Sequence, residues 1–158
     1  MKEFELQQTQ RFSDPLEEVF AFFADPANLA RITPSWLHFS IRSPQPLNMT
    51  AGTLIDYTIR MRGIPMKWRS EITAWDPPHR FVDEQRVGPY RYWIHEHTFE
   101  RSDGSTIVSD RVRYAVPGGE LVHRLFVVRD LDRIFSHRKR VLAGIFNEVR
   151  SESAARTR

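Results

Sequence analysis

The stretch from Glu120 to Ser151, ELVHRLFVVRDLDRIFSHRKRVLAGIFNEVRS, decides the fold that we predict for this chain of 158 residues. It contains no proline and a single glycine, Gly144. Its apolar residues recur at steps of three and four, which is typical of one face of a long amphipathic helix. They are Leu121, Leu125, Val128, Leu131, Phe135, Leu142, Ile145, Phe146 and Val149. At 1.5 Å per residue, a helix of about 30 residues spans roughly 45 Å, which is enough to cross a whole sheet.

The segment before this helix predicts an antiparallel sheet. From Leu37 to Val116, apolar and polar residues alternate, and turn residues such as Gly63, Gly88 and Gly104 recur at short spacing. We place strands near residues 37–42, 53–62, 66–75, 80–87, 91–101 and 105–116, after a first strand that ends near Arg11. The outcome is a curved antiparallel sheet of about seven strands.

Two short helices are expected after the first strand. Ser13 or Asp14 can cap the first helix, and Pro15 suits its first position. The pair Asp25-Pro26 repeats the signal for a second helix, which ends before Pro34. The order of elements therefore predicts one α+β domain over residues 1–151, in which the sheet wraps around the long C-terminal helix. We expect residues 152–158 to form a frayed polar tail.

Composition excludes several classes of protein. Cysteine is absent, which excludes disulfides, thiolate metal sites and a cysteine nucleophile. The net charge of +3 is weak for a nucleic-acid binder. We find no apolar run of the length of a signal peptide or a membrane span, so we expect a cytoplasmic protein with no nucleic-acid partner and no stable membrane insertion. We interpret the basic run His137–Arg140 as a solvated helix face.

Strand alternation places an unusual polar group on the apolar inner face of the sheet. Its members are Asp83, Gln85, His95, His97 and Asp110. Buried carboxylates persist only when they are paired or hydrogen-bonded. We therefore expect at least one of the two histidines to contact Asp83 or Asp110 from a neighbouring strand.

Four interpretations of this group are open. It can be a buried network that fixes the strand register, or a polar patch that orients a ligand in a cavity. It can also be an acid–base pair, with His95, His97 and Asp110 as the candidate catalytic residues. Finally, His95 and His97 can form a His-x-His metal site together with an aspartate. Because no third ligand is defined, that metal signal is weak, and we expect neither a metal nor a cofactor.

Aromatic residues on the same face extend the candidate ligand site. Trp36, Tyr57, Trp68, Trp93 and Tyr114 carry the flat apolar surface and the polar atoms that suit a pocket wall. The ligand-binding residues that we predict share the inner face of the sheet. They are Tyr57, Trp68, Asp83, Gln85, Trp93, His95, His97, Asp110 and Tyr114.

Five local motifs resemble the bacterial polyketide cyclase-like branch of the SRPBCC superfamily, over about residues 3–150. They are PLEEVFAFF at 15–23 followed by Asp25-Pro26, FVDEQ at 81–85, Gly88-Pro89-Tyr90, WIHEHTF at 93–99 and DRVRY at 110–114. The resemblance implies the START-like helix-grip fold. It leads us to expect a carrier or sensor that binds a small hydrophobic or amphipathic molecule between the sheet and the C-terminal helix. The alternatives are a cyclase or dehydratase type of enzyme that uses a His–Asp pair, and an interaction subunit with a filled core.

Overall fold

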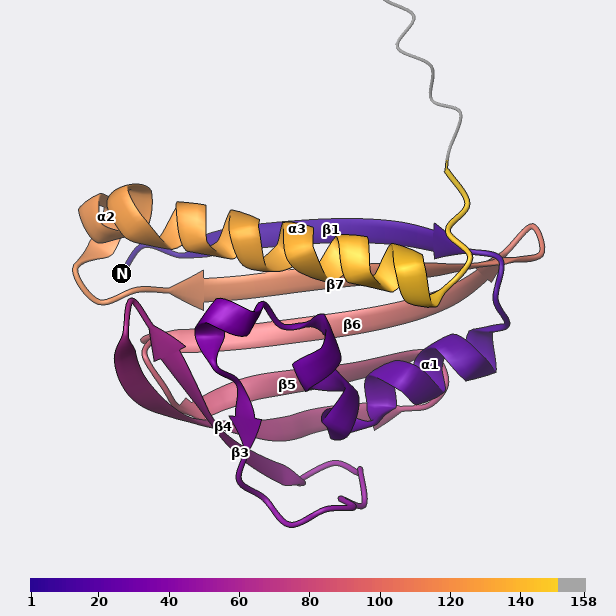
Figure 1. The fold of residues 1–158 in the computed structure, drawn as a ribbon, viewed down its shortest axis with the longest axis horizontal. Helices are drawn as coiled ribbons and strands as arrows, with labels where there is room; N and C mark the ends of the chain where they lie inside the picture. The colour runs from indigo at the N-terminus through magenta and orange to yellow at the C-terminus, as the bar shows by residue number, and fades with distance from the viewer. Residues whose placement is uncertain (151–158) are drawn as a thin grey trace, which may run out of the picture.

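In the computed structural model, which describes residues 1–150, antiparallel strands form one seven-stranded sheet in the order β1-β7-β6-β5-β4-β3-β2. The strands are β1 (Phe4–Phe12), β2 (Ser40–Ile41), β3 (Leu54–Met61), β4 (Ile64–Asp76), β5 (Arg80–Val87), β6 (Tyr92–Ser102) and β7 (Ser105–Ala115). The helices α1 (Leu16–Ala24) and α3 (Val128–Ile145) lie on the same side of the curved sheet (Figure 1). The predicted α+β helix-grip architecture is confirmed.

The segment that connects β1 to β2 contains three short helical elements. They are α1 and two 3₁₀ turns, η1 (Pro26–Ile32) and η2 (Ser35–Leu37). Both predicted short helices are therefore present, and Asp25 caps η1 by accepting a hydrogen bond from the backbone N–H of Ala27. The predicted strand over 37–42 was too long, because η2 occupies its start and only Ser40–Ile41 pair with β3.

The C-terminal helix has no break, but it is not a regular α-helix throughout. It consists of α2 (Gly119–Val122), a π-helical turn η3 (His123–Val127) and α3, and it ends at Ile145. Phe146 already has extended backbone, so the predicted continuation of the helix through residue 150 is wrong. The prediction for Ser151 and for the polar tail 152–158 lies outside the described residues.

The π turn changes which side chains face the sheet. A π turn adds a residue to the helical repeat, so residues before it rotate relative to those after it. Leu121 is 64% exposed, Leu125 54% and Val128 39%. The expectation that the stripe packs against the sheet is therefore wrong for Leu125 and Val128. The π turn accounts for the exposure of Leu125, which lies within it, but not for that of Val128, which follows it.

The middle of the predicted apolar stripe faces the sheet as expected, whereas Val149, beyond the end of the helix, is exposed. Leu131, Phe135 and Leu142 are buried. Phe146 packs on Phe12 even though it lies beyond the end of the helix. The core has two parts, one under α1 and the C-terminal end of α3, and another around Leu131 and Phe135.

This division predicts a contrast between two residues of the same stripe. Phe135→Ala should lower the free energy of unfolding by roughly 3–5 kcal/mol, because it removes a buried ring. Leu125→Ala should change that free energy by less than about 0.5 kcal/mol, because its side chain is exposed. Urea unfolding of both variants measures the difference. Equal losses in the two variants would contradict the helix phase described above.

Candidate functional site

Three neighbouring strands bring the polar residues of the inner face together. The β5–β6 register sets Asp83 opposite His95, and the β6–β7 register sets His97 opposite Asp110. Because side chains alternate between the faces of a sheet, all four point to the helix side. The hydrogen bonds run diagonally across this ladder, from His95 to Asp110 and from His97 to Asp83.

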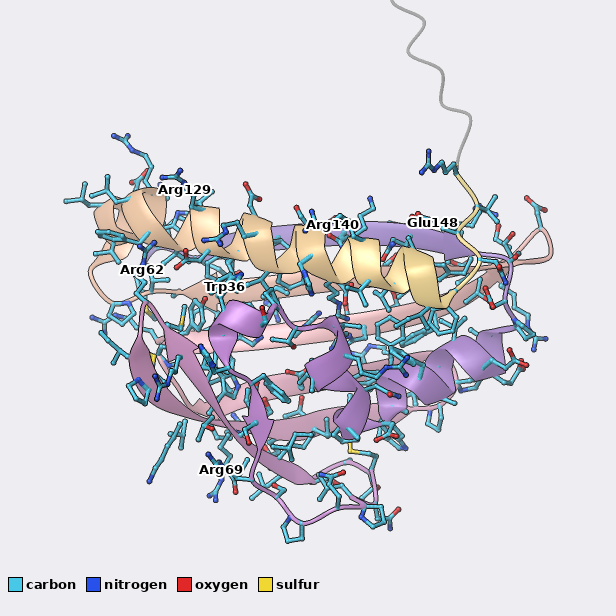
Figure 2. The ribbon with its side chains drawn as sticks, in the orientation of Figure 1. Trp36, Arg62, Arg69, Arg129, Arg140 and Glu148 are labelled. Atoms are coloured by element: carbon cyan, nitrogen blue, oxygen red, sulfur yellow. The ribbon has the colours of Figure 1, made fainter. Side chains whose placement is uncertain are left out.

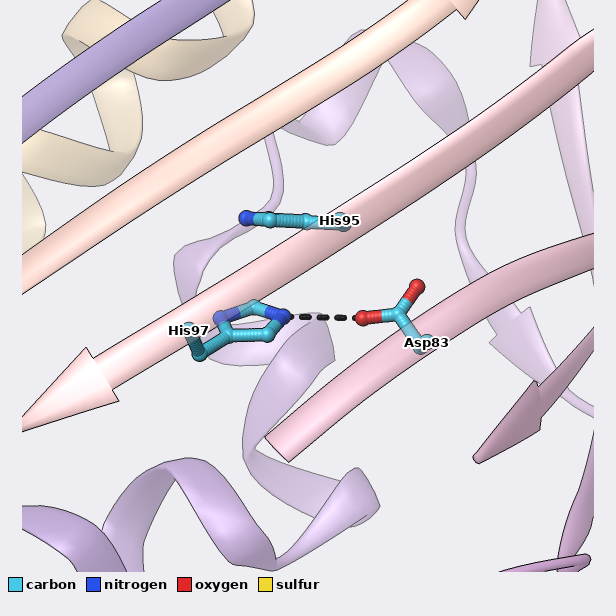
Figure 3. A group of neighbouring side chains, drawn as sticks. All are labelled: Asp83, His95 and His97. Atoms are coloured by element: carbon cyan, nitrogen blue, oxygen red, sulfur yellow. Dashed lines mark hydrogen bonds and ion pairs between the residues drawn. The ribbon is translucent and has the colours of Figure 1, made fainter. Parts of the chain in front are cut away.

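The distances define two hydrogen-bonded His–Asp pairs, each with its own carboxylate, and place Asp110 close to both histidines. His95 Nε2 lies 2.8 Å from Asp110 Oδ1, and His97 Nε2 lies 2.8 Å from Asp83 Oδ2, as Figure 3 shows for the second pair. His97 Nδ1 lies 3.1 Å from Asp110 Oδ1, but at an angle that does not make a hydrogen bond. The two imidazole rings stack with their centroids 3.7 Å apart. The expected contact between a histidine and Asp83 or Asp110 is confirmed on both sides.

Arg138 on α3 completes this group, and sequence reasoning missed it. Its Nη2 donates a hydrogen bond of 3.1 Å to Asp110 Oδ1, and the residue is only 6% exposed. The interpretation of residues 137–140 as a solvated face is therefore wrong for Arg138. The signal was present in the spacing, because Arg138 follows Phe135 by three residues and precedes Leu142 by four, on the inward stripe. We call Asp83, His95, His97, Asp110 and Arg138 the polar cluster.

The charges of the polar cluster follow from its contacts. Burial alone would raise the pKa of Asp110, but the Arg138 guanidinium and the bonded histidines outweigh it and hold that pKa well below its usual range. Burial also opposes ionisation of Asp83, yet the hydrogen bond from His97 lowers its pKa overall. Both carboxylates are therefore ionised near neutral pH.

The two histidines differ in their environment. Burial and the neighbouring His97 lower the pKa of His95, so His95 is neutral. Burial also acts to lower the pKa of His97, but its contacts with Asp110 and Asp83 outweigh burial and raise that pKa. Because ionised Asp110 can only accept, the His95 hydrogen sits on Nε2 and the lone pair on Nδ1.

Two cavities lie between the sheet and the helical elements, and the polar cluster stands where they adjoin. The larger has a volume of about 160 Å³ and the smaller about 80 Å³. Asp83, His97 and Arg138 line both of them. The other walls of the larger cavity are mainly apolar and aromatic. They include Leu29, Ile32, Leu37, Phe39, Ile59, Met61, Tyr90, Leu131, Ile134 and Phe135.

Six of the nine predicted ligand-binding residues line the larger cavity. They are Tyr57, Trp68, Asp83, Trp93, His95 and His97. The wall residues from η1 and η2, and Tyr90, could not be predicted from sequence patterns, because their position depends on how the loops fold over the sheet. The helix residues Leu131 and Phe135 were already in the predicted apolar stripe.

The other predicted residues lie elsewhere. Asp110 contacts His95 and His97 from β7 and is not part of the lining of either cavity. Gln85 uses its side-chain amide to hold the backbone of Tyr90, with a bond of 2.8 Å to the carbonyl. The hydroxyl of Tyr114 bonds to His123 Nε2 at 2.8 Å, and Trp36 borders a separate surface hollow beside α3. In Figure 2, Trp36 lies on the outer side of the molecule near α3.

The cluster also contains a set of possible metal ligands. Asp83, His95 and His97 each offer one ligand atom, and these atoms lie within 4.8 Å of one another. Figure 3 shows the three side chains side by side, with His95 above the His97 ring and Asp83 next to His97. Two imidazoles and a carboxylate make a donor set suited to transition metals.

The pairing of Arg138 with Asp110 predicts a double-mutant result. Arg138→Met should lower the free energy of unfolding by about 3–5 kcal/mol, because it leaves a buried carboxylate without its cation. Adding Asp110→Asn to that variant should restore about 1 kcal/mol or more, because the uncompensated charge is gone. Arg140→Met, an exposed change on the same helix, serves as the control. A double variant no more stable than Arg138→Met would contradict the pairing.

Comparisons with known proteins agree with the architecture. The protein Ms6760 from Mycobacterium smegmatis has 18% identity and a TM-score of 0.65, with 89% of each chain covered. Protein CV1439 from Chromobacterium violaceum has 15% identity and a TM-score of 0.70, with 90% of this chain and 97% of that chain covered. The major latex-like protein 151 from Panax ginseng has 12% identity and a TM-score of 0.66, with 91% and 97% covered. At these identities the likeness shows the fold alone.

The family assignment comes from sequence. Among curated proteins, no sequence matches the chain. The family model described as "Polyketide cyclase / dehydrase and lipid transport" matches residues 13–141, which include the polar cluster and most of the cavity wall. In the part of the chain that the structure describes, no helix is long and apolar enough to cross a membrane. The chain belongs to the polyketide cyclase/dehydrase and lipid transport family, a helix-grip family of the SRPBCC superfamily.

Proposed function

We propose that this protein binds a small, mostly apolar molecule in the larger cavity, with a polar hydrogen of that molecule directed at the polar cluster. The observation that carries this proposal is a cavity whose walls are mainly apolar and aromatic, and whose ionisable His, Asp and Arg side chains are gathered at one edge, at Asp83, His95, His97 and Arg138. Such a lining, with few convergent polar groups, is typical of small-molecule sites. The family description, which names polyketide cyclases and lipid transport, supports a hydrophobic ligand.

The volume and the wall limit the ligand class. A cavity of about 150 Å³ is known to hold benzene, so a cavity of about 160 Å³ suits one six-membered ring. Tyr57 stacks on Trp68, and Trp93 meets Trp68 edge to face, each at 5.7 Å between centroids. These interlocked rings form a rigid wall that favours a flat ligand.

The cluster presents hydrogen-bond acceptors to the cavity. Among residues 1–150, neither His95 Nδ1 nor Asp83 Oδ1 takes part in a hydrogen bond, whereas His95 Nε2 and Asp83 Oδ2 do. Both residues line the larger cavity. A ligand with a hydroxyl or N–H group satisfies these acceptors, and a purely apolar ligand leaves them unpaired.

The His–Asp pair at the cavity wall favours acid–base catalysis as a second candidate function. His97 is bonded to Asp83 at 2.8 Å, and both border the cavity. A histidine in this position can exchange a proton with a bound hydroxyl or enol, as a cyclase or dehydratase requires. Under this alternative, replacing His97 removes turnover and leaves substrate affinity largely intact. The filled-core alternative is disfavoured by the two cavities.

Phenol and toluene provide a direct test, because they match in size and differ in one hydroxyl group. With chelator-treated protein, calorimetry should show saturable binding of both, with phenol favoured by the acceptors of the cluster. Asp83→Asn should reduce the phenol-to-toluene affinity ratio by about five- to tenfold, because an amide N–H replaces an acceptor. Ile134→Phe should weaken both ligands by filling the cavity.

Tyr114→Phe is the matched control, because its hydroxyl contacts His123 and lies outside the cavity lining of the described residues. This variant should keep the affinity ratio of the unmodified protein. Absence of saturable binding of either compound would refute the proposed function. An unchanged ratio in Asp83→Asn would refute the orienting role of the cluster.

A further inference from the structure

We propose that Asp83, His95 and His97 bind a divalent first-row transition-metal ion at the wall of the larger cavity. The sequence suggested a His-x-His pair with an aspartate but did not define which residue is the third ligand. The fold supplies that ligand from the neighbouring strand β5, and it places one donor atom of each residue within 4.8 Å of the others. Around a tetrahedral ion with bonds of about 2.0–2.2 Å, donor atoms lie about 3.4 Å apart. Side-chain rotations that shift the donor atoms by about an ångström therefore bring all three to bonding distance of one ion.

Asp110 orients both imidazoles for this role. Its Oδ1 accepts the hydrogen bond from His95 Nε2 and lies 3.1 Å from His97 Nδ1. His95 therefore has its lone pair on Nδ1. When a metal ion displaces the His97 Nε2 hydrogen that now bonds to Asp83, the hydrogen of neutral His97 sits on Nδ1 and can point to the same Asp110 carboxylate. A histidine that donates to a carboxylate through one nitrogen and binds metal through the other is a recurrent arrangement in metal sites.

Two buried nitrogens of the polar cluster, His97 Nδ1 and Arg138 Nε, lack a hydrogen-bond partner among the described residues, and the first of them bears on metal binding. His97 Nδ1 is buried and has no hydrogen-bond partner among the described residues, although Asp110 Oδ1 is close enough to be one. Rotation of the ring toward an ion at Nε2 would correct the angle at Nδ1. The ion would take the place of the hydrogen that His97 Nε2 and Asp83 Oδ2 now share across 2.8 Å.

The charge of the surroundings and the type of donor favour a transition metal. Two carboxylates, Asp83 and Asp110, face a single guanidinium, Arg138, which bonds to Asp110. With both imidazoles neutral, as metal binding requires, the group has a net negative charge in an interior that is otherwise largely apolar. Imidazole donors select zinc, iron, cobalt or copper over calcium and magnesium.

The three protein ligands leave coordination positions open. His95, His97 and Asp83 all line the larger cavity, so the open side of the ion faces that space. The ion would bind an oxygen donor there, either water or the hydroxyl, phenolate or carbonyl group of a ligand. Metal binding does not depend on the organic ligand proposed above, and it is tested with the metal alone.

Titration of the chelator-treated full chain with Co²⁺ tests the site. One equivalent should produce visible absorption bands, which added Zn²⁺ should abolish and Mg²⁺ should not. Asp83→Asn and His95→Gln should each weaken Co²⁺ binding by about 100-fold or more, and the positioning variant Asp110→Asn by about 10- to 100-fold. His79→Gln, a change at an exposed turn, is the control and should bind like the unmodified protein.

A second measurement keeps the proposal testable when a variant does not fold. In the unmodified protein, one equivalent of Zn²⁺ should shift the imidazole NMR signals of His95 and His97 and leave those of His79 unchanged. Absence of a Co²⁺ spectrum would overturn the proposal, as would unaltered affinity in folded Asp83→Asn and His95→Gln. Zn²⁺ shifts confined to histidines other than His95 and His97 would also overturn it.

Discussion

An ionised carboxylate in a protein interior needs partners, and the way Asp110 meets this requirement organises the centre of the molecule. Its Oδ1 accepts hydrogen bonds from His95 on the adjacent strand β6 and from Arg138 on α3. The sheet and the helix that crosses it are thus connected at one buried atom. Loss of any partner would leave an uncompensated charge, so the position of α3 relative to β6 and β7 is tightly specified.

The cavities follow from the same connection. Apolar residues on α3, such as Leu131 and Leu142, pack closely into the two parts of the core. Between them, Arg138 extends toward Asp110, and space is left on either side of the polar cluster. The aromatic wall formed by Tyr57, Trp68 and Trp93 belongs to the larger space. A site with apolar walls and one polar edge therefore arises from the need to bury and neutralise a few charged groups.

The sequence predicted the inner face of the sheet because the side-chain period of a strand is two residues. That period alone put Asp83, His95, His97 and Asp110 together. It could not predict which histidine bonds to which aspartate, since the diagonal contacts depend on register, and register depends on turns and on irregular pairing such as that between β4 and β5. Arg138 was missed because a charged residue was assumed to face water.

The wrong prediction of buried residues at the start of the C-terminal helix has a different origin. Apolar spacing predicts a face only when the helical repeat is constant, and the π turn at His123–Val127 interrupts it. Leu121 and Leu125 are therefore exposed in the structure, although the constant repeat predicted them on the buried face. The walls from η1 and η2 were also beyond prediction, because their location depends on tertiary packing of a loop rather than on a local pattern.

The central claim is that Asp110, on β7, contacts one nitrogen of each imidazole and leaves the other nitrogen of each ring facing the cavity. Long-range proton–nitrogen NMR of the chelator-treated protein tests it most directly. The account predicts that His95 is a single tautomer with its hydrogen on Nε2, and that this hydrogen exchanges slowly with water. Rapid averaging between the two tautomers of His95, as in an exposed histidine, would contradict it.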